Sequence, residues 1–163
     1  MKKIVGLVAL MSMVMSVPAA VQAEGLDAKR FYIGGGLGFN SLPGFGSARG
    51  VQVFGGYALK SKLNEDISTA LEIGYMDSGN FDDFNNTFNA GDATGVWIAA
   101  VESVQLTRKV DMLARFGFDF GDDDGLLLGA GMQYKFDTKV AFRTEYVARE
   151  HVNSLQVNVF VNF

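Results

Sequence analysis

The 163-residue chain has no cysteine, only two prolines and a single histidine. Without cysteine it has neither a disulfide framework nor a thiol that could carry a lipid anchor. The prolines, Pro18 and Pro43, both lie outside the segments that alternate in polarity, so proline interrupts none of the expected strands. The chain is therefore read as one domain that is held together without covalent cross-links.

Long apolar runs are also scarce, because after residue 23 no segment approaches the roughly 20 apolar residues that a spanning helix requires. The exception is the start of the chain. A basic Met1-Lys2-Lys3 is followed by an apolar run over 4–17, and Val21-Gln22-Ala23 supplies a small–x–small pattern. These three parts predict a secretory signal peptide over 1–23 and a mature domain over 24–163. If the mature protein lies in a membrane, it crosses with strands.

Basic residues are fewer than acidic ones, at 14 against 18. The formal net charge is −4, and the mature chain becomes more acidic when Lys2 and Lys3 leave with the leader. This balance disfavours binding of nucleic acid through bulk charge. We expect no nucleic-acid partner, no cofactor and no metal.

Glycine and aromatic residues are abundant, with 20 glycines, 14 phenylalanines and five tyrosines, and they fall into alternating segments. Eight such segments are expected as strands, at about 31–40, 50–60, 69–75, 94–106, 111–120, 126–136, 140–146 and 154–163. One face of each is apolar with aromatic residues near its ends, and the other face carries glycines and charges. In the fourth segment the phase is ambiguous; we expect Val96, Ile98, Ala100 and Val104 to point outward, with Glu102 on the same face.

A continuous apolar outer face with aromatic ends predicts an all-β, transmembrane, eight-stranded antiparallel up-and-down β-barrel. A soluble lipocalin shows the inverse pattern, with an apolar cup inside. The connections also sort by length. Short turns at 60–66, 107–109 and 137–139 would lie on the periplasmic side, opposite longer loops at 41–49, 77–93, 121–125 and 148–153.

The last segment ends on Phe163, where apolar side chains alternate with Gln156, Asn158 and Asn162. An amphipathic strand of a soluble sandwich remains an alternative for this segment taken alone. It resembles the C-terminal signal that the barrel-assembly machinery reads in bacterial outer-membrane barrels. That resemblance implies an assembly signal at Phe163, Val161 and Val159, and it implies the barrel-assembly machinery and periplasmic chaperones as partners during biogenesis.

Five motifs carry a wider resemblance: 31–39 (FYIGGGLGF), 54–57 (FGGY), 71–75 (LEIGY), 115–117 (RFG) and 140–146 (VAFRTEY). In this order they are similar to the transmembrane domain of the OmpA-like and OmpX-like eight-stranded outer-membrane barrels, without the peptidoglycan-binding domain. The resemblance implies the outer membrane of a Gram-negative bacterium, with outer-membrane lipids and lipopolysaccharide as neighbours.

The resemblance also implies a charge network across the lumen, formed by Glu72, Arg115, Arg143 and Glu145. The chain departs from the family pattern at Gly36 and Val101, where the family has lysines, and at Gln133, where it has a glutamate, so the network should be thinner. Charges in a narrow lumen need counter-charges whatever the family. Such pairs either plug the barrel or gate a narrow pore for ions or small solutes; eight strands favour the plug, because side chains fill so small a lumen.

The outer loops carry an acidic rim at Asp77, Asp82, Asp83, Asp92, Asp122, Asp123 and Asp124. Such carboxylates bind Ca²⁺ or Mg²⁺ in some proteins and could bridge to lipopolysaccharide phosphates, but their spacing matches no metal loop, so a solvated surface is the better interpretation. Aromatic residues of the same region, Phe81, Phe84 and Phe88, either form a binding patch or pack against the barrel rim.

Enzymatic activity has one candidate site. His151 and Glu150 lie three and four residues before Ser154, and a nucleophile–base set can be imagined for a lipid A-modifying barrel. A spacing of three in a strand places His151 and Ser154 on opposite faces. We therefore expect a small outer-membrane barrel that has a structural or surface-interaction role and is not an enzyme. A narrow pore is the alternative, and a lipid A-modifying enzyme is the third hypothesis.

Overall fold

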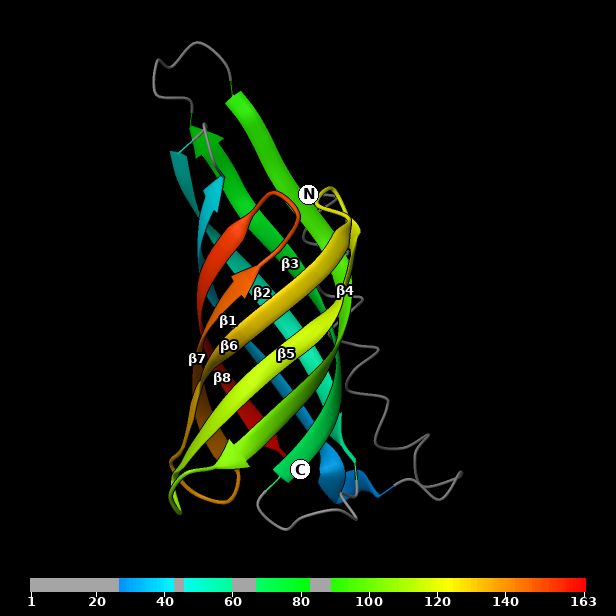
Figure 1. Ribbon diagram of the computed structural model, residues 1–163, viewed down its shortest axis with the longest axis vertical. Helices are drawn as coiled ribbons and strands as arrows, with labels where there is room; N and C mark the ends of the chain where they lie inside the picture. Colours follow the sequence, from blue (N-terminus) through cyan, green and yellow to red (C-terminus); the bar gives the residue numbers. More distant parts are fainter. Residues whose placement is uncertain (1–26, 43–45, 60–66, 83–88) are drawn as a thin grey trace.

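The structure, a computed structural model, describes residues 27–42, 46–59, 67–82 and 89–163. Eight strands in these segments form one closed antiparallel barrel in which each strand pairs with its sequence neighbours and β1 pairs with β8 (Figure 1). A short 3₁₀ turn, η1 (Ala28–Arg30), precedes them. The strands are β1 (Phe31–Leu42), β2 (Gly46–Ala58), β3 (Ile67–Asp82), β4 (Asn89–Gln105), β5 (Val110–Gly121), β6 (Gly125–Lys135), β7 (Val140–Ala148) and β8 (Asn153–Asn162).

Closure satisfies the backbone of every strand by pairing, which is the condition for β-structure in lipid. The predicted all-β, eight-stranded antiparallel barrel is confirmed. No helix of the described segments is long and apolar enough to cross a membrane. The expected leader at 1–23 and the expected turn at 60–66 lie outside the described residues.

Side chains alternate between the two surfaces of the barrel wall, as the period of a strand requires. On β5 the apolar side chains other than Leu113 point out, and Phe116 and Phe120 remain 56% and 60% exposed. The polar members of the same strand point in, so that Arg115 is buried. The expected phase of β4 is correct, because Val96 and Glu102 are exposed. Large apolar side chains exposed around the wall form the surface that meets lipid.

The two ends of the barrel differ. The short turns, η1 and the C-terminus lie at one end, while β3 and β4 reach furthest at the other (Figure 1). Short turns mark the periplasmic end of outer-membrane barrels and longer loops the extracellular end.

The extracellular loops are shorter than the sequence predicted. The predicted loops at 41–49 and 77–93 lie largely in strands, because β1 and β2 continue to Leu42 and from Gly46, and β3 and β4 continue to Asp82 and from Asn89. Polarity stops alternating where both faces of a strand leave the membrane, although the hydrogen-bonded ladder continues. The β3–β4 ladder also shifts register between Asp77 and Asp82.

Candidate functional site

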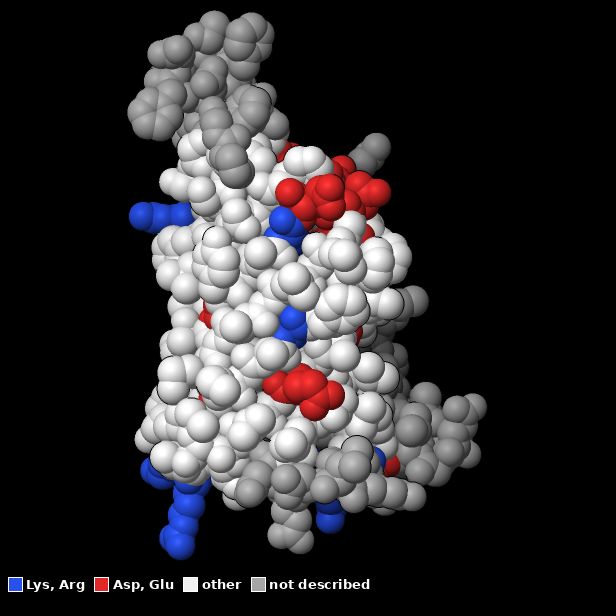
Figure 2. Space-filling view, in the orientation of Figure 1, with Lys and Arg blue, Asp and Glu red and all other residues white. Residues whose placement is uncertain are grey.

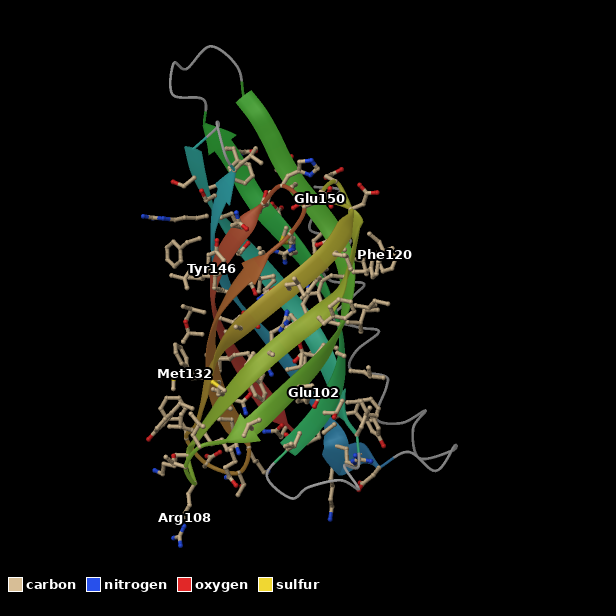
Figure 3. All side chains as sticks on the ribbon, viewed as in Figure 1. Glu102, Arg108, Phe120, Met132, Tyr146 and Glu150 are labelled. Carbon is tan, nitrogen blue, oxygen red and sulfur yellow. The ribbon has the colours of Figure 1, made fainter. Side chains whose placement is uncertain are left out.

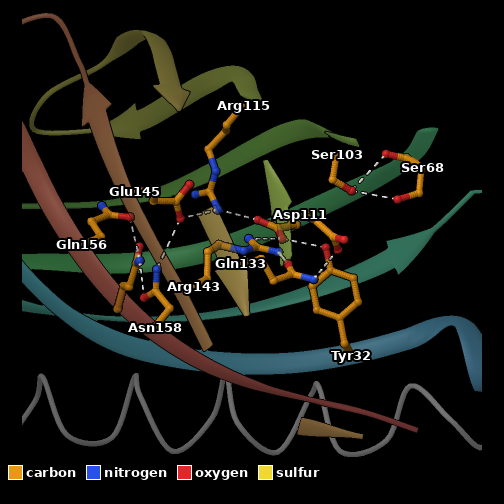
Figure 4. A network of polar contacts seen from close by, with 12 residues as sticks. Tyr32, Ser68, Ser103, Asp111, Arg115, Gln133, Arg143, Glu145, Gln156 and Asn158 are labelled. Atoms are coloured by element: carbon orange, nitrogen blue, oxygen red, sulfur yellow. Dashed lines mark hydrogen bonds and ion pairs between the residues drawn. The ribbon is translucent and has the colours of Figure 1, made fainter. Parts of the chain in front are cut away.

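The lumen holds a charge network halfway along the barrel, built from inward positions of three strands. Glu72 on β3 accepts from Arg143 on β7 at 2.7 Å and from Arg115 on β5 at 2.7 Å, one guanidinium on each carboxylate oxygen (Figure 4). Arg115 also pairs with Glu145 at 3.0 Å. The four residues that the resemblance implied are thus in one cluster of two cations and two anions, which balances its own charge in a buried space.

Glu72 is the centre of this cluster. Beside its two guanidinium partners it accepts a third hydrogen bond, from the Tyr32 hydroxyl at 2.6 Å. Its side chain and that of Arg115 have no exposed area, and that of Arg143 is 3% exposed. Removing one partner from such a group leaves a buried charge uncompensated, so the network fixes the positions of β1, β3, β5 and β7 relative to one another.

Neutral amides extend the network, and one of them, Gln133, stands where the family pattern has a glutamate. Gln133 accepts from Arg143 at 3.4 Å, and its amide donates to Asp111 at 3.3 Å. On the other side Asn158 donates to Glu145 at 3.3 Å and accepts from Gln52 at 2.7 Å. The network is therefore wider than the four charged residues, because amides take lumen positions at no cost in net charge.

An aromatic layer packs against the charges, and the sequence analysis did not predict it. Tyr32, Phe54, Trp97 and Phe160 all point inward and are buried. The Arg115 guanidinium lies 4.6 Å from the Trp97 ring centroid, and that of Arg143 lies 4.8 Å from the Phe160 ring. The alternation placed Tyr32 and Phe54 on the inward face, but glycines and charges were expected to dominate the lumen. The same alternation at Phe160 could have revealed the layer.

Glycines make room for the rings. At Gly34 an added Cβ would lie 2.6 Å from both Phe54 and Phe160, and at Gly74 it would collide with the Trp97 ring. The inward-facing glycines thus set the space into which the aromatic side chains fold, and together they pack the lumen around the charge network.

A second buried polar cluster lies nearer the extracellular end, and sequence reasoning missed it. Arg149, just after β7, pairs with Asp119 at 3.0 Å and donates to Ser154 at 3.0 Å. Ser154 donates to Asn40 at 2.6 Å, and Asn40 donates to the Ser78 carbonyl at 2.7 Å. Arg149 shares the inward parity of Arg143 and Glu145, which was the available indication.

The acidic rim is not uniformly solvated as predicted. Asp123 is only 3% exposed and joins two loops, since it accepts from the His151 and Val152 amides and lies against the His151 ring, all at 2.9 Å. Asp122 accepts from the Thr94 amide at 2.9 Å. Unpaired backbone donors at the loop ends attract these carboxylates.

The remaining carboxylates of the acidic rim also differ, because some accept backbone hydrogen bonds and others are exposed. Asp77 accepts from the Gly79 amide at 2.9 Å, whereas Asp124 is exposed. Asp83 and the side chain of Asp82 lie outside the described residues. Within the described part of the chain, no three acidic or histidine side chains are grouped so that they could hold a metal ion.

The mouth of the barrel at this end is filled by apolar side chains. Phe81 packs with Ala48 and Val152, all buried, and Leu42 and Ala93 cover them. Of the two predicted roles for the loop aromatics, Phe81 takes the packing role; residues 84 and 88 lie outside the described segments.

The candidate catalytic residues Ser154 and His151 have different surroundings. Ser154 is fully buried among Asn40 and Arg149, as described above, and the His151 side chain is 68% exposed against Asp123.

The periplasmic end differs from the mouth, because a cavity of about 250 Å³ enters the lumen there. Its polar lining includes Asp111, Gln133 and Arg143, and Tyr32 and Phe160 are among its inner residues. Lys135 pairs with Asp111 at 2.8 Å at its edge.

The predicted assembly residues lie where β8 closes the barrel. Val159, Val161 and Phe163 are exposed on the outer surface, and the Phe163 amide donates to the Phe31 carbonyl at 3.0 Å.

Comparison with known proteins gives a family. Residues 7–161 match the family described as the outer membrane protein beta-barrel domain. No curated protein sequence matches significantly.

Among solved structures, a de novo designed transmembrane β-barrel is similar at a TM-score of 0.56 and 15% identity, over 84% of this chain and 98% of that one. Ail, the attachment invasion locus protein of Yersinia pestis, is similar at 0.55 and 15%, over 82% and 96%. At these identities the likeness concerns the fold. Since the family match spans most of the sequence and the closed barrel presents a lipid-facing wall, the chain belongs to the outer membrane protein β-barrel domain family, as a small barrel of the outer membrane of Gram-negative bacteria.

Proposed function

We propose that this protein is a closed outer-membrane barrel with a structural or surface-interaction role, and that its lumen network is a plug. The observation that carries the proposal is the position of Glu72, which takes both Arg115 and Arg143 and the Tyr32 hydroxyl in a space with no exposed area. A hydrated ion would have to displace these partners to pass.

Further layers support a plug. The inward aromatic rings pack beside the charges, and at the extracellular mouth Phe81 and Val152 are 2% exposed each. A solute entering from the periplasmic cavity therefore meets charges packed among aromatic rings, and an apolar seal at the far end.

Planar-bilayer recording of the purified, refolded protein tests the plug directly. We expect no stepwise conductance from the wild type, while a large trimeric porin in the same bilayer gives open steps as the positive control. Reproducible ion-selective steps from the wild type would overturn the plug and favour the alternative.

The alternative is a narrow pore, and one observation favours it: the periplasmic cavity already reaches Arg143. If the wild type conducts, Glu72→Gln should change the size or selectivity of the steps, because Arg143 would lose its only ion pair among the described residues. An unchanged conductance in that variant would place the ion path elsewhere.

The surface role is constrained by charge. Ail has been solved in complex with the heparin analogue sucrose octasulfate. In this chain Asp122, Asp124 and Glu150 are exposed at the extracellular end, where Figure 2 shows a dense acidic patch. Such a surface repels polysulfated sugars, and cations or divalent-bridged lipopolysaccharide suit it better.

Titration with sucrose octasulfate measures this directly. We expect no binding at physiological salt, and we expect none in a Glu150→Gln variant either. Saturable binding by the wild type would contradict the proposal.

A non-catalytic role is supported by the different surroundings of the two candidates, since Ser154 is buried against Asn40 and Arg149 whereas His151 is exposed and bonded to Asp123. Mass spectrometry of lipid A from cells that express the wild type should match the empty-vector control. An added or missing acyl chain that disappears in Ser154→Ala and His151→Ala would show an enzyme.

A further inference from the structure

The outer wall over β3, β4 and β5 carries a groove of about 480 Å³. Its floor is Ala100, whose ladder partners are Leu71 on β3 and Phe116 on β5. One ladder row further toward the extracellular end, Ile98 lies between Ile73 and Phe118. Because a methyl group stands between larger side chains, the surface is hollowed at Ala100 and both walls of the hollow are apolar.

Glu102 stands at the periplasmic end of this groove. It is the next outward-facing residue after Ala100 on β4, and its ladder partners are Thr69 and Ala114. The Thr69 hydroxyl lies 2.9 Å from both carboxylate oxygens and holds the side chain on the wall. Across the described segments, no cationic side chain pairs with Glu102. Figure 2 shows acidic atoms on the otherwise mainly uncharged wall where Figure 3 labels this residue.

The depth of Glu102 follows from its neighbours. Figure 3 places Glu102 and Met132 at similar heights on the barrel. The next outward residue on β6 toward the periplasmic turn is Tyr134, and the Lys109 ammonium lies 5.9 Å from its ring centroid. Aromatic rings with cations beside them mark the headgroup level of a membrane. Glu102 therefore lies close to the periplasmic headgroups, and the groove rises from it into the hydrocarbon.

An ionised carboxylate on a lipid-facing wall is costly unless a cation meets it. Anionic headgroups are repelled by Glu102. A quaternary ammonium carries the right charge but donates no hydrogen bond, whereas a primary ammonium supplies both.

We propose that Glu102 and the groove over Ala100 form a site for one phospholipid of the periplasmic leaflet that carries a primary ammonium headgroup. The ammonium donates to the Glu102 carboxylate beside Thr69. One acyl chain lies along the groove between Leu71 and Phe116. This site is independent of whether the lumen conducts.

Native mass spectrometry tests the headgroup. The protein is released from nanodiscs that contain equal amounts of ethanolamine, choline and glycerol phospholipids with the same acyl chains. We expect the ethanolamine lipid to be enriched on the wild type, and the enrichment to fall about fivefold in Glu102→Gln. The matched control Glu150→Gln removes an exposed extracellular carboxylate and should keep the wild-type lipid ratio. If Glu102 is only hydrated at the interface, Glu102→Gln retains the wild-type ratio and the proposal fails.

A second variant tests the groove without touching the charge. Ala100→Phe fills the floor between Leu71 and Phe116 and should lower the amount of retained ethanolamine lipid, while heat-modifiable gel mobility shows that the barrel has folded. Undiminished lipid retention by a folded Ala100→Phe variant would overturn the assignment of the acyl chain to the groove.

Discussion

Replacing Glu72 by glutamine should destabilise this barrel more than replacing its partner Arg143. Glu72 is the only ion-pair partner of Arg143 among the described residues, whereas Arg115 retains Glu145 at 3.0 Å. The variant therefore leaves a buried guanidinium without a counter-charge. Breaking a buried pair in this way costs about 3–5 kcal/mol of unfolding free energy. Arg143→Met should cost less, since Glu72 then keeps Arg115 and the Tyr32 hydroxyl.

The double variant separates the pair from its surroundings. If Glu72 and Arg143 interact as the 2.7 Å distance indicates, Glu72→Gln with Arg143→Met costs less than the sum of the single changes. Contacting residues of one network typically show a coupling energy of about 0.5–3 kcal/mol, and full burial places this pair toward the upper part of that range.

The chain supplies its own reporter for this measurement. Trp97 is the only tryptophan and is fully buried, with the Arg115 guanidinium 4.6 Å from its ring centroid. Its fluorescence should therefore follow unfolding of the barrel by guanidinium chloride in lipid vesicles. Equal slopes of free energy against denaturant in all four proteins are required before their free energies are compared.

A double-mutant cycle on the Lys135–Asp111 pair, at the periplasmic cavity, gives a reference coupling energy. Lys135 and Asp111 are 2.8 Å apart, but the Lys135 side chain is 36% exposed. Water screens such a pair, and its coupling should not exceed about 1 kcal/mol. A Glu72–Arg143 coupling no larger than that of Lys135–Asp111 would refute the reasoning that burial makes the central network structurally decisive.

Three further outcomes are expected. Deleting Phe163 should abolish outer-membrane assembly, so that the protein accumulates in the periplasm or is degraded; normal membrane levels with heat-modifiable mobility would contradict an assembly signal there. Phe118→Arg should cost about 2–4 kcal/mol of unfolding free energy and Phe136→Arg, at the periplasmic end, about 0–1 kcal/mol; equal costs would mean that the lipid-facing band is misplaced. Hydrogen bonds from the Val140 and Lys139 amides hold the pKa of Asp137 below its usual range. The stability that the Asp137 carboxylate gives the β6–β7 turn is therefore present at neutral pH, and it is lost as the pH falls below about 4 through the lowered pKa. The protection factor of the Val140 amide against hydrogen exchange should fall in acid, and this pH dependence should be lost in Asp137→Asn.

The wall of the barrel was predictable because lipid imposes a rule on every outward position. Alternation alone assigned the correct faces of β4 even at Glu102, where the pattern is broken by a charge. The ends of β3 and β4 were not predictable in the same way. The Asp77–Asn80 stretch has the composition of a loop, because the ladder shifts register there and Ser78 is buried in a polar cluster, although the strand continues on both sides.

The site was predictable only where a charge requires a partner. The family resemblance implied a network that includes Glu72 and Arg143, and a buried charge requires a counter-charge in any family. The bonds of Asn158 and Gln133 could not be predicted, since a neutral amide has no obligatory partner type and its geometry depends on the register of three strands. Asp123 was misjudged because an acidic turn has the same composition whether its carboxylate faces water or caps two backbone amides.

The loss of charges relative to the family pattern does not loosen the lumen, because volume is supplied by other means. Val101 is 3% exposed, and at Gly36 an added Cβ would collide with the Val157 carbonyl, so neither position could hold a lysine without displacing its neighbours. Aromatic rings beside glycines occupy the space instead, and two of them, Tyr32 and Phe160, line the cavity that opens to the periplasm. This cavity reaches Arg143, so the charge network stands at its inner end. A barrel arranged in this way resists ions at its centre by burial and charge together, which is why the Glu72 cycle and the conductance recording test the same physical claim.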